Sequence, residues 1–448
     1  MSDVLRRKLA LAKCRGPLIM PGDRDYDRAR RVWNGVVDRK PAAVLYAENV
    51  DDVRKAIDIA ASCDAVLAIR AGGHSFPGLS TCDAGLLLDL SQLNSTRLNT
   101  SAGTVEAGGG AMLRDLDGAT VSKGYVVPAG VISHTGVAGL TLGGGMGRVS
   151  RAYGLTIDSL IGAEIVTAIG SVTWIDADSD PELFWGIRGG GGNFGVVTRF
   201  KFKLHQLGLV SVGQWSYPVA SARRAIAVLG ELAQQRPREF SVAFTLASLS
   251  LGMTAVWVGD SRHAERMLSP FGELAGAGEG TMGAMPFIEL QSRNDVHFAW
   301  SRRYYAKGGF WRDISGEAVD AMVQQITTAP TPDSELYVTQ LGGAVSDVPE
   351  DATAYSGRQA GYYWIAEPVW DNPADDERCI AWGRAAAEQM ADPSIQANYI
   401  NEQADTAIAS GAYGAVKYDR LRRLKSRLDP TNRFRLNQNI VPLAAAPR

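Results

Sequence analysis

The stretch from Arg70 to Ser75, with the sequence Arg-Ala-Gly-Gly-His-Ser, combines residue types that could perform chemistry on a ligand. Residues 65–69 before it are all apolar and match a buried strand in length, so Gly72 and Gly73 fall where the chain must turn. Because glycine has no side chain, a flat ligand could approach the backbone here, with His74 at its edge. The alternative is an ordinary strand end whose histidine is satisfied by neighbouring groups.

Two further glycine clusters lie downstream of this turn. Within residues 130–147 the glycines are Gly130, Gly136, Gly139, Gly143, Gly144, Gly145 and Gly147. A third cluster runs from Gly189 to Gly192 and is followed by Asn193, Phe194 and Gly195. Such glycines let backbone N–H groups approach a pyrophosphate without obstruction by side chains. The pattern therefore predicts that these loops lie close to a ligand.

A Rossmann dinucleotide site is one interpretation of the second cluster, but the spacing disfavours it. That fingerprint directly follows the first strand of a βαβ unit and has an acidic residue about twenty positions further on. Glu164 lies at roughly that distance, but it falls inside an apolar segment, and the cluster comes late in its domain. We therefore do not expect a nicotinamide cofactor.

Composition bounds the partners of the chain. The 448 residues carry a formal net charge of -2, and no run of lysine and arginine is long enough to follow a nucleic acid backbone. The four cysteines, Cys14, Cys63, Cys82 and Cys379, lie far apart, which argues against a zinc cluster or a disulfide framework. No apolar run has the length of a signal peptide core or a membrane span. We expect a cytoplasmic protein with a small-molecule partner, and no nucleic acid, membrane or metal.

The elements that must position these residues fall into two regions. In the first, we expect helices at 49–62 and 111–122 and strands at 43–46, 66–69, 85–90, 97–99, 104–107, 161–168 and 172–175. After Leu204 glycine becomes rarer, and we expect strands at 211–217, 240–246 and 253–258 and helices at 220–234 and 260–271. Short strands mixed with helices indicate an α+β fold, and the change in composition indicates a second domain.

Four motifs, in this order along the chain, resemble those of a known family. They are the stretch from Arg70 to Ser75, the segment from Pro128 to Gly147, Arg-Gly-Gly-Gly-Gly-Asn-Phe-Gly from Arg188, and Asp-Pro-Thr-Asn-Arg-Phe from Asp429. On these motifs the chain resembles the flavoprotein oxidases of the vanillyl-alcohol oxidase and p-cresol methylhydroxylase superfamily, in the berberine-bridge-enzyme-like branch. The resemblance spans about residues 30–440 and is loosest between about 208 and 395.

The resemblance implies an α+β flavoprotein with two domains. Residues 1–207 would form an FAD-binding domain of the p-cresol methylhydroxylase type, with its core at about 38–207. Residues 208–395 would form a substrate-binding domain, in which helices flank an antiparallel sheet. Residues 396–448 would return to the first domain, which makes the FAD-binding domain discontinuous.

The resemblance also implies that the glycine turn cradles the FAD pyrophosphate, and that a ring nitrogen of His74 is bonded to the C8-methyl group of the isoalloxazine. Many members add a second bond from a cysteine, but Ile132 occupies that position here, so a single attachment is expected. Thr135 stands where the family controls access of oxygen to the flavin, and it is small enough to admit oxygen. The other expected FAD contacts are Arg70, Ala71, Gly72, Gly73, Ser75, Gly78, Pro128, Gly130, Val131, Ser133, His134, Gly136, Gly139, Leu140, Gly143, Gly144, Gly147, Tyr153, Gly154, Val166, Asn437 and Asn439.

Three residues are candidates for the chemistry on the substrate side. Tyr399 lies in a Tyr-x-Asn segment typical of this branch and is the first candidate for a base or an orienting hydroxyl group. A free tyrosine has a pKa of about 10, so a basic role would need a nearby cation or specific hydrogen bonds. Gln340 replaces the glutamate base of some relatives, and a glutamine can orient a substrate but cannot usefully accept a proton. Glu367 is a possible substitute carboxylate.

The resemblance implies an FAD-dependent oxidase that transfers a hydride from a small organic alcohol or amine to the flavin, with O2 as electron acceptor and H2O2 as product. Two alternatives stay open. One is a tailoring enzyme that cyclises, desaturates or repeatedly oxidises a polyketide or alkaloid. The other is a resistance flavoprotein that binds a reactive drug and masks it by redox cycling. The sequence does not identify the substrate or the oligomeric state.

Overall fold

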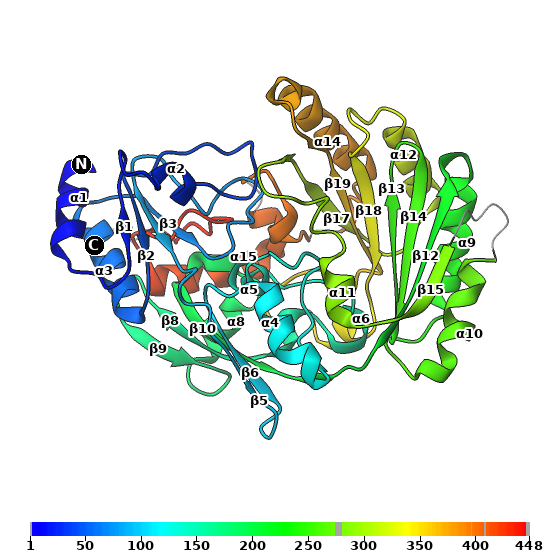
Figure 1. Cartoon of the computed structure of the whole chain (residues 1–448), viewed down its shortest axis with the longest axis horizontal. Coiled ribbons are helices and arrows are strands. Elements are labelled where there is room, and N and C mark those ends of the chain that lie inside the picture. The colour runs from blue at the N-terminus through cyan, green and yellow to red at the C-terminus, as the bar shows by residue number, and fades with distance from the viewer. Residues whose placement is uncertain (1, 274–279, 396, 407–408, 445–448) are drawn as a thin grey trace.

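The computed structural model describes residues 2–273, 280–395, 397–406 and 409–444, and it contains two lobes (Figure 1). The chain builds the first lobe, then the second, and returns to the first with its C-terminal segment. The fold class is α+β, as predicted. The predicted domain boundaries fall in the connections after β11 (His205–Gln206) and after α14 (Asp376–Met390).

Two main sheets build the first lobe. The first has the order β1-β2-β4-β3, and β2 and β3 run parallel to β4. The second is antiparallel and has the order β5-β6-β10-β8-β9. The strands, with the short β7 that pairs with β11, are β1 (Leu18–Ile19), β2 (Ala43–Tyr46), β3 (Leu67–Arg70), β4 (Leu86–Asp89), β5 (Thr96–Asn99), β6 (Thr104–Gly108), β7 (Tyr125–Val126), β8 (Leu160–Val166), β9 (Val172–Ile175) and β10 (Val196–Lys203).

Helices cover these sheets. α3 begins where the side chain of Asn49 accepts a hydrogen bond from the backbone N–H of Asp52, and its face with Val53, Ile57 and Ala60 is buried. The helices of this lobe are α1 (Ser2–Leu11), α2 (Tyr26–Ala29), α3 (Val50–Ser62), α4 (Leu113–Thr120), η1 (Val121–Lys123), α5 (Val137–Leu142), α6 (Ser150–Tyr153), α7 (Thr156–Ser159), α8 (Pro181–Ile187), η2 (Gly191–Asn193), η7 (Ile400–Glu402) and α15 (Ala409–Leu428).

The C-terminal helix α15 packs into the core of the first lobe (Figure 1). Leu421 and Leu424 share one hydrophobic cluster with Val105 and Phe200 of the five-stranded sheet. No helix among the described residues is long and apolar enough to cross a bilayer.

A seven-stranded antiparallel sheet dominates the second lobe, with the order β15-β12-β14-β13-β18-β19-β17. Its strands, with the separate pair β16 and β20, are β12 (Val210–Pro218), β13 (Phe240–Leu246), β14 (Ser250–Trp257), β15 (Gly280–Met285), β16 (Arg303–Tyr304), β17 (Lys307–Trp311), β18 (Glu335–Gln340), β19 (Tyr362–Glu367) and β20 (Val369–Trp370). The helices are η3 (Val219–Ser221), α9 (Ala222–Gln234), η4 (Ser261–His263), α10 (Ala264–Leu268), η5 (Ser269–Phe271), α11 (Phe287–Ser292), α12 (Gly316–Ile326), α13 (Ala344–Asp347), η6 (Pro373–Asp375) and α14.

The two faces of this sheet have different partners. Leu336 and Val338 of β18 share a core with Met322 of α12 and Trp382 of α14, so even positions of β18 face the helices. Side chains alternate along a strand, and odd positions therefore face away from the helices, towards the first lobe. This alternation decides which residues of the second lobe can reach a site between the lobes.

Buried polar contacts join the lobes. The guanidinium group of Arg358, which is fully buried, donates to the carboxylate of Asp158 at 2.7 Å. The indole N–H of Trp33 donates to the carbonyl oxygen of Phe298 at 2.8 Å. Because breaking a buried hydrogen bond leaves unsatisfied polar groups, these contacts hold the two lobes in one relative position.

Asp117 on α4 is a buried carboxyl group that gives a prediction on stability. Neither of its oxygens has a hydrogen-bond partner at bonding distance among the described residues. Burial raises its pKa to about 7, although the nearby side chain of Gln291 opposes this shift in part. Because the folded pKa lies above the unfolded value, ionisation lowers the free energy of unfolding progressively as the pH rises from about 4 to above 7. Asp117→Asn should therefore raise the free energy of unfolding by about 1–3 kcal/mol at about pH 8 and much less at about pH 5.

Urea unfolding of the variant and the unmodified protein at both pH values checks this prediction. An equal effect of Asp117→Asn at the two pH values would show that the ionisation of Asp117 does not limit stability.

Candidate active site

A cavity of about 520 Å³ is lined by residues of both lobes. Its volume lies in the range of about 300–1,000 Å³ that is usual for small-molecule sites. The first lobe contributes the turn after β3, the loop before α5 and the segment around η2. The sheet of the second lobe and two C-terminal segments, around residues 399–402 and 434–438, complete the wall.

The turn after β3 is held from behind by Arg70. Its guanidinium group is buried, pairs with Asp89 and donates to the carbonyl oxygens of Arg31 at 2.8 Å and Ala29 at 2.6 Å. Gly73 then adopts a φ of +68°, which side chains rarely permit. Arg70 therefore shapes the turn from the protein side and does not reach the cavity, contrary to the expectation that it contacts the cofactor.

Two of the predicted glycine clusters meet backbone to backbone. A Cβ atom on Gly72 would lie 2.3 Å from the nitrogen of Gly136, and one on Gly136 would lie 2.4 Å from the nitrogen of Gly72. Any side chain would force these loops apart, so only glycine fits at both positions. The clusters at 72–73 and 130–139 thus form one continuous part of the cavity wall.

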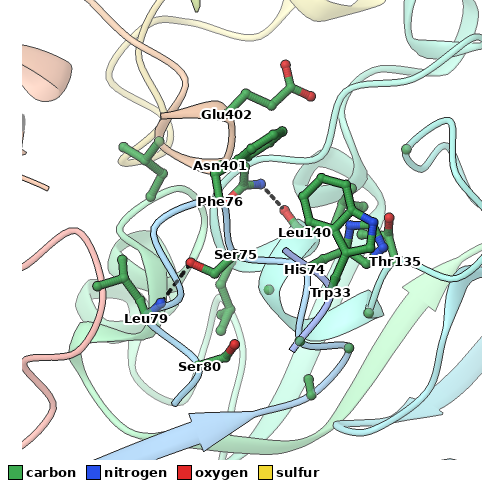
Figure 2. Close-up of a pocket in the computed structure, with 18 of the residues that line it drawn as sticks. Trp33, His74, Ser75, Phe76, Leu79, Ser80, Thr135, Leu140, Asn401 and Glu402 are labelled. Atoms are coloured by element: carbon green, nitrogen blue, oxygen red, sulfur yellow. Dashed lines mark hydrogen bonds between the residues drawn. The ribbon is translucent and has the colours of Figure 1, made fainter. Parts of the chain in front are cut away.

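His74 lies on this wall beside Trp33 (Figure 2). The ring stacks on Trp33 with centroids 4.3 Å apart, and its Nε2 lies 2.7 Å from Nδ1 of His134. Burial lowers the pKa of His74 well below its ordinary value, and the charge of a protonated His134 would lower it further. The imidazole is therefore neutral near pH 7, and Nδ1 is the ring nitrogen not engaged by His134.

The structure sorts the predicted site residues into two groups. Those on the cavity wall are Ala71, Gly72, Gly73, His74, Ser75, Gly130, Val131, Thr135, Gly136, Gly139, Leu140, Tyr399 and Asn437. Those outside the cavity wall are Arg70, Gly78, Pro128, Ser133, His134, Gly143, Gly144, Gly147, Tyr153, Gly154, Val166, Gln340 and Asn439.

Several of the outlying glycines pack against protein. A Cβ atom on Gly143 would lie 2.0 Å from Oδ1 of Asn401, and one on Gly147 would lie 1.6 Å from the carbonyl oxygen of Ala129. Tyr153 is also turned away, because its hydroxyl group donates to the carbonyl oxygen of Gln206 at 2.9 Å. These residues pack against protein in the structure, and their contact with the cofactor stays a prediction.

The wall fits a polar ligand on the side of the first lobe. Three of its buried side-chain atoms, Ser80 Oγ, Asn437 Oδ1 and Gln438 Oε1, have no hydrogen-bond partner among the described residues. The backbone N–H groups of residues 72–75 likewise donate to no carbonyl group there. Buried polar groups are normally satisfied, so this side suits a ligand rich in acceptors and donors, and the free N–H groups suit a phosphate.

Tyr399 is almost fully buried, and its hydroxyl oxygen is held by two donors. The backbone N–H of Met146 donates to it at 3.3 Å and Nδ2 of Asn401 at 3.0 Å. Burial, and then the charge of Glu402, raise the pKa of Tyr399 above its ordinary value. Because both lone pairs of the oxygen are used, the hydroxyl proton is free to be donated, and the geometry favours an orienting donor over a base.

Gln340 does not face the cavity. It occupies an even position of β18, and its Nε2 donates to the carbonyl oxygen of Ala233 on α9 at 3.0 Å. This contact corrects the prediction of a role in binding substrate, because the side chain is used between the sheet and its covering helix.

Acidic residues on the opposite face of the sheet take its place. Glu335 and Glu367 line the cavity, as does Glu402 of η7. Burial raises the pKa of Glu335 and of Glu402 to about 7 each. Burial, and then the charges of Glu335 and Glu402, raise the pKa of Glu367 well above its ordinary value. Glu367 was anticipated as a substitute carboxylate, whereas the sequence reasoning missed Glu335 and Glu402.

Comparisons with known proteins agree with this arrangement. Residues 41–176 match a family model described as "FAD binding domain", and residues 398–441 match one described as "Berberine and berberine like". The matched segments contain the glycine turn and the C-terminal wall of the cavity. The fold and site define a two-domain FAD-dependent oxidoreductase.

Relatives along the whole chain place it more narrowly. It is 31% identical over 433 residues to an FAD-linked oxidoreductase of Dictyostelium discoideum, covering 96% of this chain and 95% of the relative. It is 26% identical to the (R)-6-hydroxynicotine oxidase of Paenarthrobacter nicotinovorans, covering 99% of each. The structure of BBE-like 1 from Physcomitrella patens superposes with a TM-score of 0.90 at 23% identity, over 99% of this chain and 100% of that one. The chain belongs to the FAD-linked oxidoreductases of the berberine-bridge-enzyme-like branch.

Proposed function

We propose that this enzyme is an oxidase that converts a small organic alcohol or amine to the carbonyl or imine product, with O2 as the electron acceptor and H2O2 as the second product. FAD, when bound, supplies the acceptor for the hydride. The observation that carries the proposal is the two-sided cavity. One wall holds the glycine turn and His74, and the other holds Tyr399 and the buried carboxyl groups.

We further propose that FAD is attached covalently, and only through Nδ1 of His74. In the tautomer in which Nε2 of His74 donates to Nδ1 of His134, 2.7 Å away, Nδ1 of His74 carries the lone pair that attachment needs. The side chain that follows the proline-alanine-glycine-valine segment is Ile132, which also lines the cavity and offers no thiol for a second bond. On this proposal residues 1–207 and 396–448 form the FAD-binding domain, and residues 208–395 form the substrate-binding domain.

The side chains of the opposite wall would handle the proton of the substrate. Loss of a hydride from the C–H bond of an alcohol must be matched by loss of its O–H proton. Glu402, with a pKa of about 7, is suited to accept this proton near neutral pH. Tyr399, whose hydroxyl proton is free, would donate a hydrogen bond that fixes the substrate oxygen or nitrogen.

Thr135 supports O2 as the acceptor. It lies on the cavity wall close to His74 (Figure 2), where a larger side chain would reduce the space available. Its size is consistent with access of oxygen to the cofactor.

Single-turnover and steady-state measurements test the proposal. The purified enzyme is mixed without oxygen with a panel of primary alcohols and amines, and bleaching of the flavin identifies a substrate. Air is then admitted, and we expect the colour to return with one H2O2 formed for each product molecule, over many cycles. Flavin that is reduced once without turnover would instead support a redox-masking protein, and product formed without stoichiometric H2O2 would exclude the oxidase assignment.

A further inference from the structure

Two glutamates face each other across neighbouring strands on the cavity side of the sheet. Glu335 of β18 and Glu367 of β19 are register partners in an antiparallel pair, so their Cβ atoms lie about 4.5–5.5 Å apart. Both side chains line the cavity. Two carboxyl groups directly opposite one another cannot both ionise without destabilising the sheet, unless a cation binds between them.

Among the described residues, no positively charged side chain pairs with Glu335 or Glu367. Glu367 is 6% exposed and forms neither a hydrogen bond nor an ion pair there. The Nε2 of His297 lies 3.6 Å from Glu335, but burial lowers the pKa of His297, which leaves this ring neutral near pH 7. The guanidinium group of Arg302 is bound by Asp333 and by another aspartate at the surface.

We propose that Glu335 and Glu367 bind an ammonium group of the substrate, so that the enzyme acts on cationic amino compounds. This inference rests on the proposed oxidase function and names its substrate class. A protonated nitrogen has no lone pair to assist loss of hydride from the adjacent carbon. The bound ammonium group is therefore a second functional group, separate from the alcohol or free amine that is oxidised.

The rest of this wall suits an apolar body between the two functional groups. Phe298, Tyr337 and Ile365 line the cavity close to the glutamate pair. Apolar walls with a few placed polar groups are typical of sites that orient a small organic ligand. An amino alcohol or a diamine with an aromatic or aliphatic spacer matches this arrangement.

Three probes that share a benzyl alcohol scaffold and differ in charge test the proposal. They are 4-(aminomethyl)benzyl alcohol, which is a cation near neutral pH, the neutral 1,4-benzenedimethanol, and the anion 4-(hydroxymethyl)benzoate. Each is titrated into the oxidised holoenzyme without oxygen, and the change in the flavin spectrum gives Kd. We expect the cation to bind at least about tenfold more tightly than the neutral diol, and the anion to bind least.

Two variants assign the effect to the glutamate pair. Glu367→Gln and, separately, Glu335→Gln should each weaken binding of the cation about tenfold or more and leave binding of the diol within about twofold. Glu388→Gln, at an exposed position of α14 on the far side of the sheet, is the matched control and should change neither constant. If one variant does not fold, the other variant and the probe series on the unmodified enzyme still decide.

The outcomes separate this inference from the proposed function. Equal binding of the three probes, or a preference for the cation that survives both substitutions, overturns the ammonium site. Neutral alcohols that yield H2O2 while the cation fails to bind would leave the oxidase function standing and remove the inference. Tight binding of the cation without reduction of the flavin by any probe would support the ammonium site and contradict the oxidase function.

Discussion

His74→Ala is expected to abolish covalent attachment of flavin while the fold persists. The fraction of protein that carries acid-stable flavin should fall from nearly one to zero. The ring lies at the cavity wall, where it stacks on Trp33 and contacts His134, outside the sheets of both lobes. Cofactor that is only bound non-covalently is released when the protein is denatured. Acid precipitation followed by the colour of the pellet, together with the mass of the intact chain, measures the result.

His134→Ala is the matched variant for this experiment. It removes the partner that engages Nε2 of His74 at 2.7 Å but keeps the nucleophile, so attachment should continue at a lower rate. A coloured pellet from His74→Ala would place the bond on another residue. Unchanged attachment in His134→Ala would mean that the contact between the two rings does not direct the reaction.

Asp429→Ala is expected to lower the free energy of unfolding by about 3–5 kcal/mol. Asp429 and Lys425 are both 0% exposed, and Nζ of Lys425 lies 2.8 Å from the carboxylate. The same carboxylate accepts the backbone N–H groups of Arg433 and Phe434, each at 2.8 Å. Removal of the carboxylate leaves a buried ammonium group without its counter-ion and releases the turn that leads to Asn437. Urea unfolding gives the free energy.

Glu182→Ala provides the control for a surface ion pair. Glu182 pairs with Arg420 at 2.6 Å, but both side chains are 41% exposed, so the loss should stay below about 1 kcal/mol. Similar costs for the two substitutions would show that burial of the pair at Asp429 does not determine its contribution. The hydrogen bonds from the backbone to Asp429 would then account for its contribution.

The sequence predicted the first lobe well because its signals are local. Alternation and helical spacing located β2, α3 and β3 within one residue of their observed ends. The central strand β10 was not predicted, although Phe200 and Phe202 alternate there with lysines, because it directly follows a glycine cluster that is typical of a loop. The helices α12 and α14 were also not predicted, and their apolar positions pack only against the distant sheet.

The parts of the candidate site that are formed by backbone were predicted from the sequence. The prediction was wrong where a role depends on the direction in which a side chain points. Glycine turns reveal close approach from sequence alone, and the contact of Gly72 with Gly136 follows that rule. The role of Gln340 depended on which face of β18 it occupies, and the even positions proved to face the helices. The same parity would have indicated Glu335, five positions earlier, on the cavity side.

The buried contacts between the lobes, such as Arg358 with Asp158 and Trp33 with Phe298, also bear on how the enzyme is made. The wall of the cavity comes partly from the second lobe and partly from the C-terminal segment, which follows both lobes along the chain. The site is therefore complete only when these three parts of the chain have docked together, so its formation reports on the folding of the whole protein and not of one lobe.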